Sequence, residues 1–481
     1  MRRALRRVEL ACLPLLLAAL ALHAVEAEPL RPSVKASIAK GEVDRALAMA
    51  REGVEQRPGE AQAWADLAAA RYRAADFEGC EVAAEKALGL DEKNADARVA
   101  RARARFTRGA GAAAVEDLRR AHEFEPRHAL ALRLLAGGAD FNADRARVRE
   151  LAGEFLKLDA PKDDLFANHL RQGLALLDAL GEEPVNVYPL REQVPERLSL
   201  PMRNLPGGPS IELKGPAGAR VTFLLDTGEE SLTLRAETAR RLGAKLLSEM
   251  PAATATGIAS MKQALVPSLA AGEWTVRNVL ASIGSQDIVG PAFFEGFRVK
   301  LDFPKGEAVL ARQDPGAAPN ADDLARAPEG FRRFRFRRLG GLVCVPLASP
   351  GLTSPPERPA WGVLDTGCEP TCVLFPGYVG GLKAAHGRPP LALPIPGGLG
   401  GAAAGSGGGD ARVLPEFQLA WLQQIQDASP ALCSASVASI NKVLEVELAG
   451  VIGWPLIGRA FRSIEIDFER CVLTVEPRAR R

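Results

Sequence analysis

The sequence predicts a multidomain α + β protein in which an N-terminal α-helical array precedes two β-rich lobes. Between residues 30 and 180, apolar residues recur at three- and four-residue steps, the spacing of amphipathic helices. After residue 197 the chain alternates apolar and polar residues between Pro- and Gly-rich breaks, as strands do. One ordered set of motifs occurs twice in this strand-rich part, which predicts two lobes of similar construction.

The N-terminus has the composition of an export signal. Arg2, Arg3, Arg6 and Arg7 precede an apolar run from Leu10 to Leu22, and small residues follow it up to Ala27. We therefore expect residues 1–27 to be a cleaved signal peptide and the mature protein to be periplasmic or secreted. The run is shorter than the ~20 residues that a membrane anchor needs. No later segment is long and apolar enough to span, so no stable membrane span is expected.

Small residues recur at a fixed spacing in the helical part. Gly41, Ala75 and Gly109 lie 34 residues apart, and a second set has the same spacing: Ala46, Cys80 and Ala114. On these residues the region resembles tetratricopeptide (TPR) repeats, with about three units and a decayed fourth through residue 180. The resemblance implies a concave face that can hold a peptide or a protein partner. A helical spacer without binding function is the alternative.

Changes in composition set the expected domain boundaries. The helical periodicity stops at residues 182–203, which contain several Pro residues. An Ala-, Pro- and Asp-rich stretch then divides the strand-rich part in two. The predicted order is the signal peptide (1–27), the TPR-like helical domain (30–180), the first lobe (197–313), a linker (314–330) and the second lobe (331–477).

Each lobe has an apolar strand that runs into Asp-Thr-Gly, at Asp226–Gly228 and at Asp365–Gly367. Further along each lobe, two apolar residues and a Gly occur, at Ile288–Gly290 and at Val451–Gly453. Another strand-like segment comes after each of them. A single Asp-Thr-Gly is common in turns. Two copies in the same ordered context indicate that the two turns act together.

Two Asp carboxyls brought to about 3 Å cannot both ionise, so they share one proton. The ionised member can take a proton from water while the protonated one polarises a carbonyl, without a covalent intermediate. Gly228 and Gly367 allow the close approach of the two turns. The hydroxyls of Thr227 and Thr366 can hydrogen-bond across the pair of turns and support their geometry.

On these motifs, residues 197–477 resemble the aspartic proteases, in particular the bacterial retropepsin-like branch, with two such lobes fused in one chain. The resemblance implies two acid-protease barrel lobes, endopeptidase activity on a polypeptide substrate, and catalysis by Asp226 and Asp365. It also implies a flap that contacts substrate at Thr256, Gly257 and Ile258. It requires neither a metal nor an organic cofactor.

Departures from the family pattern leave alternatives open. Glu229 and Cys368 follow the two Gly residues where the family usually has Ala or Ser, and the second copy diverges further. The Glu229 carboxylate is expected near the pair, where it would raise their affinity for protons. The main alternative function is a non-catalytic periplasmic peptide-binding scaffold. The lobes could pair within one chain or between two chains, and their unequal lengths favour pairing within one chain.

Charge and cysteine content exclude further classes. Lys+Arg number 61 against 59 Asp+Glu, a formal net charge of +2, so a nucleic-acid partner is disfavoured. In an exported protein, a Cys344–Cys471 bridge is plausible and Cys368 and Cys372 form another candidate pair. Few histidines and no Cys-x-x-Cys disfavour a metal site.

Overall fold

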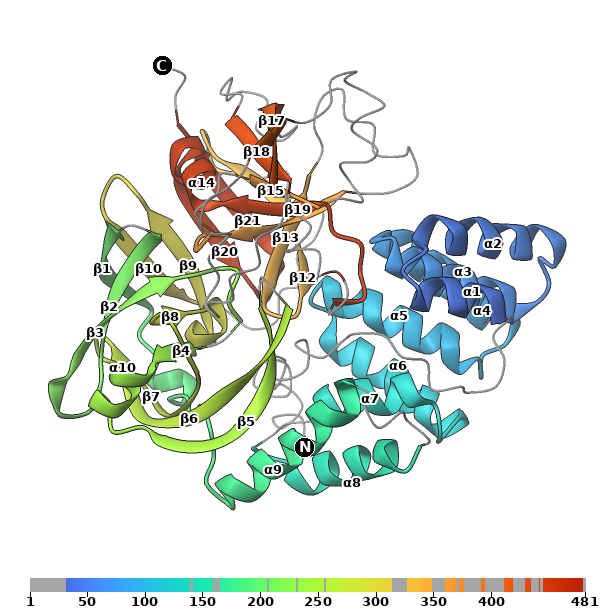
Figure 1. Ribbon diagram of the computed structural model, residues 1–481, viewed down its shortest axis with the longest axis horizontal. Helices are drawn as coiled ribbons and strands as arrows, with labels where there is room; N and C mark the ends of the chain where they lie inside the picture. Colours follow the sequence, from blue (N-terminus) through green and yellow to red (C-terminus); the bar gives the residue numbers. More distant parts are fainter. Residues whose placement is uncertain are drawn as a thin grey trace. The chain divides into compact units, whose positions relative to one another are not determined.

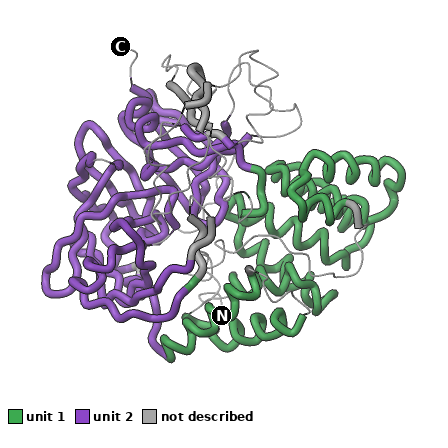
Figure 2. Tube along the Cα trace, viewed as in Figure 1, with its two compact units in different colours: residues 1–181, 250–253, 440–447 green, residues 182–249, 254–439, 448–481 purple. Residues whose placement is uncertain are grey.

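In the computed structural model, the chain forms two compact units (Figure 2). Unit 1 comprises residues 1–181, 250–253 and 440–447, and unit 2 comprises residues 182–249, 254–439 and 448–481. The structure describes residues 32–138, 142–158, 165–205, 207–230, 232–254, 257–313, 327–347, 360–368, 372–375, 391–393, 411–417, 429–433, 441 and 444–478.

Unit 1 is an array of antiparallel helix pairs, so the predicted TPR-like fold is confirmed (Figure 1). Successive helices pack on one another along the chain, and α3 also contacts α5 in the next pair. The described helices are α1 (Pro32–Ala39), α2 (Val43–Gln56), α3 (Ala61–Arg73), α4 (Phe77–Leu90), α5 (Ala95–Thr107), α6 (Gly111–Phe124), α7 (Ala129–Gly138), α8 (Arg145–Leu156) and α9 (Leu165–Leu180). None of these described helices is long and apolar enough to cross a membrane.

The 34-residue spacing has a direct structural cause. Gly41, Ala75 and Gly109 each lie in the turn within a helix pair and adopt left-handed backbone angles, with φ of 75°, 61° and 80°. Glycine tolerates this conformation best, and Ala is the smallest substitute that has a side chain. The second set is fully buried between the helices: Ala46, Cys80 and Ala114. Small side chains at these places let neighbouring helices pack closely.

Unit 2 contains two sheets, with the short helices α10 (Ala236–Arg241) and α14 (Trp454–Ala460). The first sheet runs, in spatial order, β11 (Arg332–Arg335), β21 (Val472–Pro477), β20 (Phe461–Asp467), β9 (Phe297–Asp302), β10 (Glu307–Arg312), β1 (Arg197–Leu205), β2 (Gly208–Lys214), β3 (Arg220–Leu225), β8 (Ile288–Val289), β4 (Leu232–Arg235), β7 (Trp274–Gly284), β6 (Gly257–Ala271) and β5 (Lys245–Thr254). The second runs β12 (Arg337–Leu339), β13 (Leu342–Pro346), β14 (Trp361–Asp365), β19 (Gly450–Gly453), β15 (Cys372–Leu374), β18 (Ser429–Cys433), β17 (Ala411–Phe417) and β16 (Leu391–Leu393).

The two lobes share the first sheet. Strand β9 of the first lobe pairs antiparallel with β20 of the second, with Leu301 opposite Ile464. Both residues are fully buried in the apolar core that the lobes have in common. The sequence predicted these two strands but not their pairing. The shared sheet joins the lobes within one chain.

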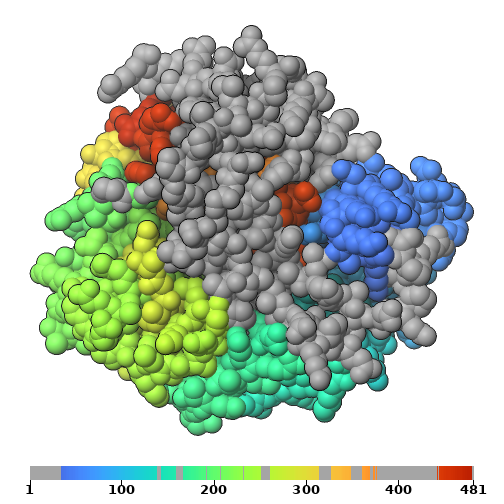
Figure 3. All heavy atoms as spheres, viewed as in Figure 1, coloured from blue at the N-terminus to red at the C-terminus, as the bar shows by residue number. Residues whose placement is uncertain are grey.

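An aromatic cluster supports the first lobe. The Trp274 ring lies 5.4 Å from Phe293, 6.1 Å from Phe294 and 5.3 Å from Phe297, measured between ring centroids. Phe293 and Phe297 meet Trp274 edge to face, and Phe294 is stacked with it. All four rings are buried, and such aromatic pairs stabilise beyond their buried area. In the space-filling view the green and yellow residues of this lobe form a continuous surface (Figure 3).

The proposed cysteine bridges are not formed. Cys344 in β13 and Cys471 before β21 are buried as free thiols, and no disulfide joins Cys368 to Cys372. Burial raises the pKa of the Cys471 thiol to about 11. The prediction assumed an oxidised pair, whereas here both thiols are buried as small apolar side chains. Three other predicted features lie outside the described residues: the signal peptide at residues 1–27, the linker up to residue 326, and Thr256.

Candidate active site

Both aspartates lie at the ends of equivalent strands. Asp226 follows β3, which pairs in parallel with β8 (Leu224 opposite Ile288). Asp365 ends β14, which pairs in parallel with β19 (Val363 opposite Val451). The apolar-apolar-Gly segments that repeat in the sequence are therefore the strands beside the two Asp turns.

The two turns are hydrogen-bonded to each other through their threonines. The Thr227 hydroxyl donates to the carbonyl oxygen of Leu364 at 2.6 Å and accepts from the backbone N–H of Thr366 at 3.0 Å. The Thr366 hydroxyl donates to the carbonyl oxygen of Leu225 at 2.6 Å and accepts from the N–H of Thr227 at 3.0 Å. Both threonines are fully buried. Each hydroxyl thus uses its donor and one acceptor position on the opposite lobe.

The two carboxyl groups lie within hydrogen-bonding reach of one another. Asp226 Oδ1 accepts from the N–H of Gly228 at 2.7 Å, and Asp365 Oδ1 accepts from the N–H of Gly367 at 2.9 Å. A Cβ on Gly228 would lie 2.5 Å from Asp365 Cγ, and one on Gly367 would lie 2.4 Å from Asp226 Cγ. Glycine is required here because each turn packs against the carboxyl of the other lobe.

The pair is arranged to hold a proton. Burial raises the pKa of Asp226, although hydrogen bonds from Asp365 and from the turn N–H groups oppose part of this rise. Burial also raises the pKa of Asp365 well above its ordinary value, and the charge of Asp226 and the hydrogen bond between them raise it further. The two groups titrate as a pair.

Gly290 keeps the first turn in place. A Cβ at this position would lie 2.3 Å from the carbonyl oxygen of Glu229, so only glycine lets the two backbones approach. Just before β8, the buried carboxylate of Asp287 accepts from the N–H and Nε of Arg235 and from the Thr238 hydroxyl, at 2.7–2.9 Å. Sequence reasoning missed Asp287, although an Asp directly before the apolar-apolar-Gly segment was a signal for it.

Another carboxyl near the first turn belongs to Glu230, the neighbour of the Glu229 that the sequence suggested. Its Oε1 accepts from the N–H of Gly341 at 2.9 Å. Burial raises the pKa of Glu230 to about 8, despite that hydrogen bond. The N–H of Glu229 donates to the carbonyl oxygen of Asp226 at 3.3 Å, and the effect of its carboxylate on the aspartate pair stays a prediction.

Glu230→Gln is expected to change how stability depends on pH. Because the folded-state pKa of Glu230 is raised from its ordinary 4.5 to about 8, its stabilising contribution is complete below pH 4.5 and lost as pH rises through 8. Gln does not ionise, so the variant keeps its stability as pH rises. Its Tm should match that of the parent near pH 4 and exceed it by a few degrees above pH 8, at about 2–4 °C per kcal/mol. Thermal unfolding between pH 4 and 9 measures both profiles. Parallel profiles would show that Glu230 titrates normally.

The flap prediction rests partly on residues without a described position. Thr256 lies outside the described residues, between β5 and β6. Gly257 and Ile258 begin β6, and their side chains are outside the described set. The assignment of substrate contacts to these three residues stays a prediction.

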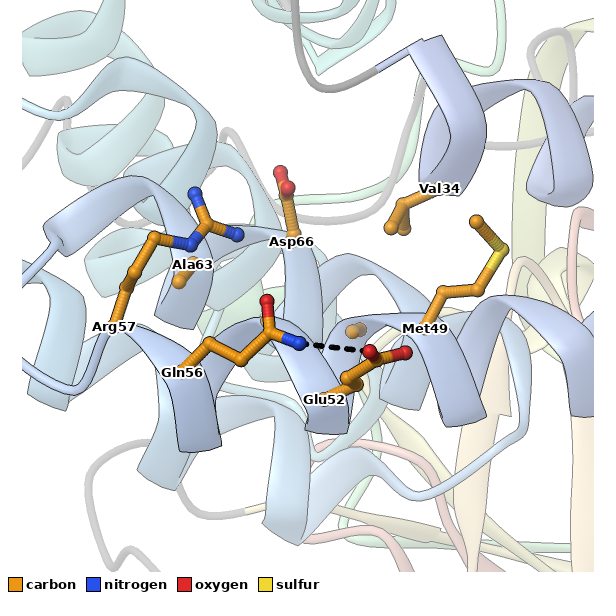
Figure 4. Close-up of a pocket in the computed structure, with 9 residues that line it drawn as sticks. Val34, Met49, Glu52, Gln56, Arg57, Ala63 and Asp66 are labelled. Atoms are coloured by element: carbon orange, nitrogen blue, oxygen red, sulfur yellow. Dashed lines mark hydrogen bonds between the residues drawn. The ribbon is translucent and has the colours of Figure 1, made fainter.

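A separate cavity of about 160 Å³ lies in unit 1, among α1, α2 and α3 (Figure 4). Its lining mixes Val34 and Met49 with polar residues, and Gln56 donates to the Glu52 carboxylate at 2.7 Å. The described lining contains no pair of carboxyls in contact. No cluster of three or more His, Cys, Asp or Glu that could hold a metal occurs in the described ranges.

The fold and the paired turns define a class: TPR-like helical repeats joined to a two-lobed β-rich region of the aspartyl-protease type. Residues 211–291, which include the first Asp-Thr-Gly turn and Gly290, match the family model described as aspartyl protease. No curated protein matches the chain.

Two solved structures are similar to parts of the chain. The first TPR of Spaghetti (RPAP3) bound to the HSP90 peptide SRMEEVD is 20% identical, covers 30% of this chain and 98% of its own, and has a TM-score of 0.21. The crystal structure of MamA is 17% identical, covers 32% of this chain and 89% of its own, and has a TM-score of 0.24.

Proposed function

We propose that the protein is an exported aspartic endopeptidase that hydrolyses peptide bonds with a water activated between Asp226 and Asp365. The observation that carries this proposal is the pair of turns that hydrogen-bond to one another across the lobes and set each Asp carboxyl against the glycine of the opposite turn. The family match to residues 211–291 supports the class of chemistry. The TPR-like array recruits the polypeptide substrate or a partner protein.

The single shared proton divides the pair into two roles. The ionised member removes a proton from the attacking water, while the protonated member donates a hydrogen bond to the carbonyl oxygen of the substrate. The water oxygen bonds to the carbonyl carbon and gives a tetrahedral intermediate. The carbon–nitrogen bond then breaks as the amine leaves with a proton from the pair, which restores its single-proton state.

The alternative function, a non-catalytic peptide clamp, would not need the carboxyls in contact. A gap wider than one bridging water would favour the clamp, because each carboxyl would then ionise by itself. Each carboxyl packs against the glycine of the opposite turn, and the two groups influence each other's pKa, which favours hydrolysis instead.

The proposal is tested by incubating the purified chain with unfolded proteins from pH 3 to 8 and identifying new termini by mass spectrometry. We expect cleavage in a bell-shaped window, because activity needs one proton on the pair and is lost when both groups are protonated or both ionised. The Asp226→Asn/Asp365→Asn double variant is the blank. A folded parent chain that cleaves nothing at any of these pH values would overturn the proposal in favour of the clamp.

A further inference from the structure

Residues 440–447 belong to unit 1, although they are far from the helices in sequence (Figure 2). The segment is held at its backbone by Arg73 at the end of α3. Arg73 Nη1 donates to the carbonyl oxygen of Asn441 at 2.9 Å, and the N–H of Glu447 donates to the carbonyl oxygen of Arg73 at 2.9 Å. These two contacts hold Asn441 and Glu447 against the end of α3.

The side chain of Glu445 is the centre of the contact. Its Oε2 accepts from Arg103 at 2.7 Å and from Arg133 at 2.7 Å, and its Oε1 accepts from Arg133 at 3.2 Å. The three side chains are only 14%, 12% and 23% exposed, in the order Arg103, Arg133 and Glu445. A two-point contact of one guanidinium with a carboxylate is both strong and geometrically specific.

The two arginines are themselves positioned by aromatic rings from other helices. The Arg103 guanidinium of α5 stacks over Tyr72 of α3 at 3.9 Å, and that of Arg133 of α7 lies over Phe166 of α9 at 5.2 Å. Stacking of this kind fixes the orientation of a guanidinium before a ligand arrives. We call this set of Tyr72, Arg103, Arg133 and Phe166 the basic pocket.

Two further features mark Glu445 as tightly bound. Its backbone has φ of 51°, a left-handed conformation that residues with side chains adopt only where surrounding contacts hold them. Burial alone would raise the pKa of the Glu445 carboxyl, but attraction to Arg133 and Arg103 outweighs burial and lowers it to about 2. The carboxylate is therefore ionised at every pH at which the protein is expected to work.

We propose that the basic pocket is a receptor for an acidic side chain, and that Glu445 is its resident ligand, which an acidic peptide can displace. The residue is an internal ligand because its own chain supplies it. A tethered ligand has an effective concentration in the millimolar range, so a free peptide competes poorly until Glu445 is removed. Strand β19 begins three residues after Glu447 and pairs with β14, the strand that ends at Asp365. Displacement of Glu445 would therefore loosen the segment that leads into β19.

The test measures binding of a fluorescent peptide of residues 440–448 to the full chain by anisotropy. All chains carry Asp226→Asn, so that proteolysis cannot consume the probe and the outcome does not depend on the proposed activity. The Glu445→Ala chain should bind the probe about tenfold or more tightly than the chain with Glu445. Adding Arg133→Gln should remove the gain, and a probe with Gln at position 445 should not bind.

The matched control is Glu447→Gln, which makes the same charge change two residues away and should leave probe affinity at the parent level. Equal affinity of the Glu445→Ala and parent chains, or equal binding of the Glu and Gln probes, would overturn the proposal. A second measurement avoids dependence on the Ala variant. In Glu445→Gln, amides 444–447 should exchange hydrogen faster than in the parent, and unchanged exchange would also contradict the proposal.

Discussion

Asp226→Asn and Asp365→Asn should each reduce peptide cleavage by about 10²–10⁴-fold, since each variant removes one member of an acid–base pair. At either position, Asn can neither remove a proton from water nor hold the shared proton. Initial rates on one unfolded substrate, measured across pH 3–8, test both variants. Asp178→Asn, an exposed aspartate in α9, is the control and should retain the parent rate.

The same two variants should be more stable than the parent at neutral pH. Because the folded-state pKa of Asp365 is raised above its ordinary 3.8, its stabilising contribution is complete below that value and lost as pH rises through the folded-state pKa. The same sign holds for Asp226. Asn carries no charge to bury, so the variants do not lose this stability as pH rises. Variants that lose activity and also unfold more easily at pH 7 would show that the carboxylates support the fold, contrary to this prediction.

Thr227→Val should destabilise unit 2 by about 2–5 kcal/mol, because it leaves the buried carbonyl of Leu364 and the N–H of Thr366 without their partner. Valine has nearly the same volume, so packing is preserved. Cleavage should fall as well, since the turn that carries Asp365 loses its support. Thr366→Val should have a similar effect through Leu225 and Thr227.

Denaturant unfolding of both variants measures this effect, and Thr227→Ser is the control. Serine retains the hydroxyl and loses one methyl group, so most of the stability should return. The double Val variant should cost less than the two single changes together, because the hydroxyls belong to one network. A Val variant as stable as the Ser variant would mean that the cross-lobe hydrogen bonds contribute little.

Local patterns in the sequence were sufficient for the fold class and for the two Asp turns. The 34-residue spacing is visible because each repeat needs a left-handed turn and a buried small residue at the same place. The Asp-Thr-Gly triplets are visible because close approach of Asp226 and Asp365 restricts the residues around them.

Contacts between distant segments could not be predicted in this way. Nothing in β9 or β20 specifies the partner strand, because alternation determines which face is buried and not which strand lies beside it. Glu445 lies in an unremarkable stretch, and its arginines come from helices more than 300 residues earlier in the chain. Glu229 and Glu230 are adjacent and chemically alike, so only the fold shows which one receives the N–H of Gly341.

The sharing of one sheet by both lobes has a consequence for how the two halves of the site evolve and work. In a symmetric dimer, a substitution beside one aspartate is copied beside the other, and the two remain equivalent until a substrate arrives. Here both lobes belong to one polypeptide, and their strands β9 and β20 pair with each other. A substitution beside one aspartate therefore leaves the residues beside the other unchanged. The two turns already differ in sequence, since Glu229 follows Gly228 whereas Cys368 follows Gly367. The two sides of the aspartate pair are therefore chemically unlike before any other molecule binds.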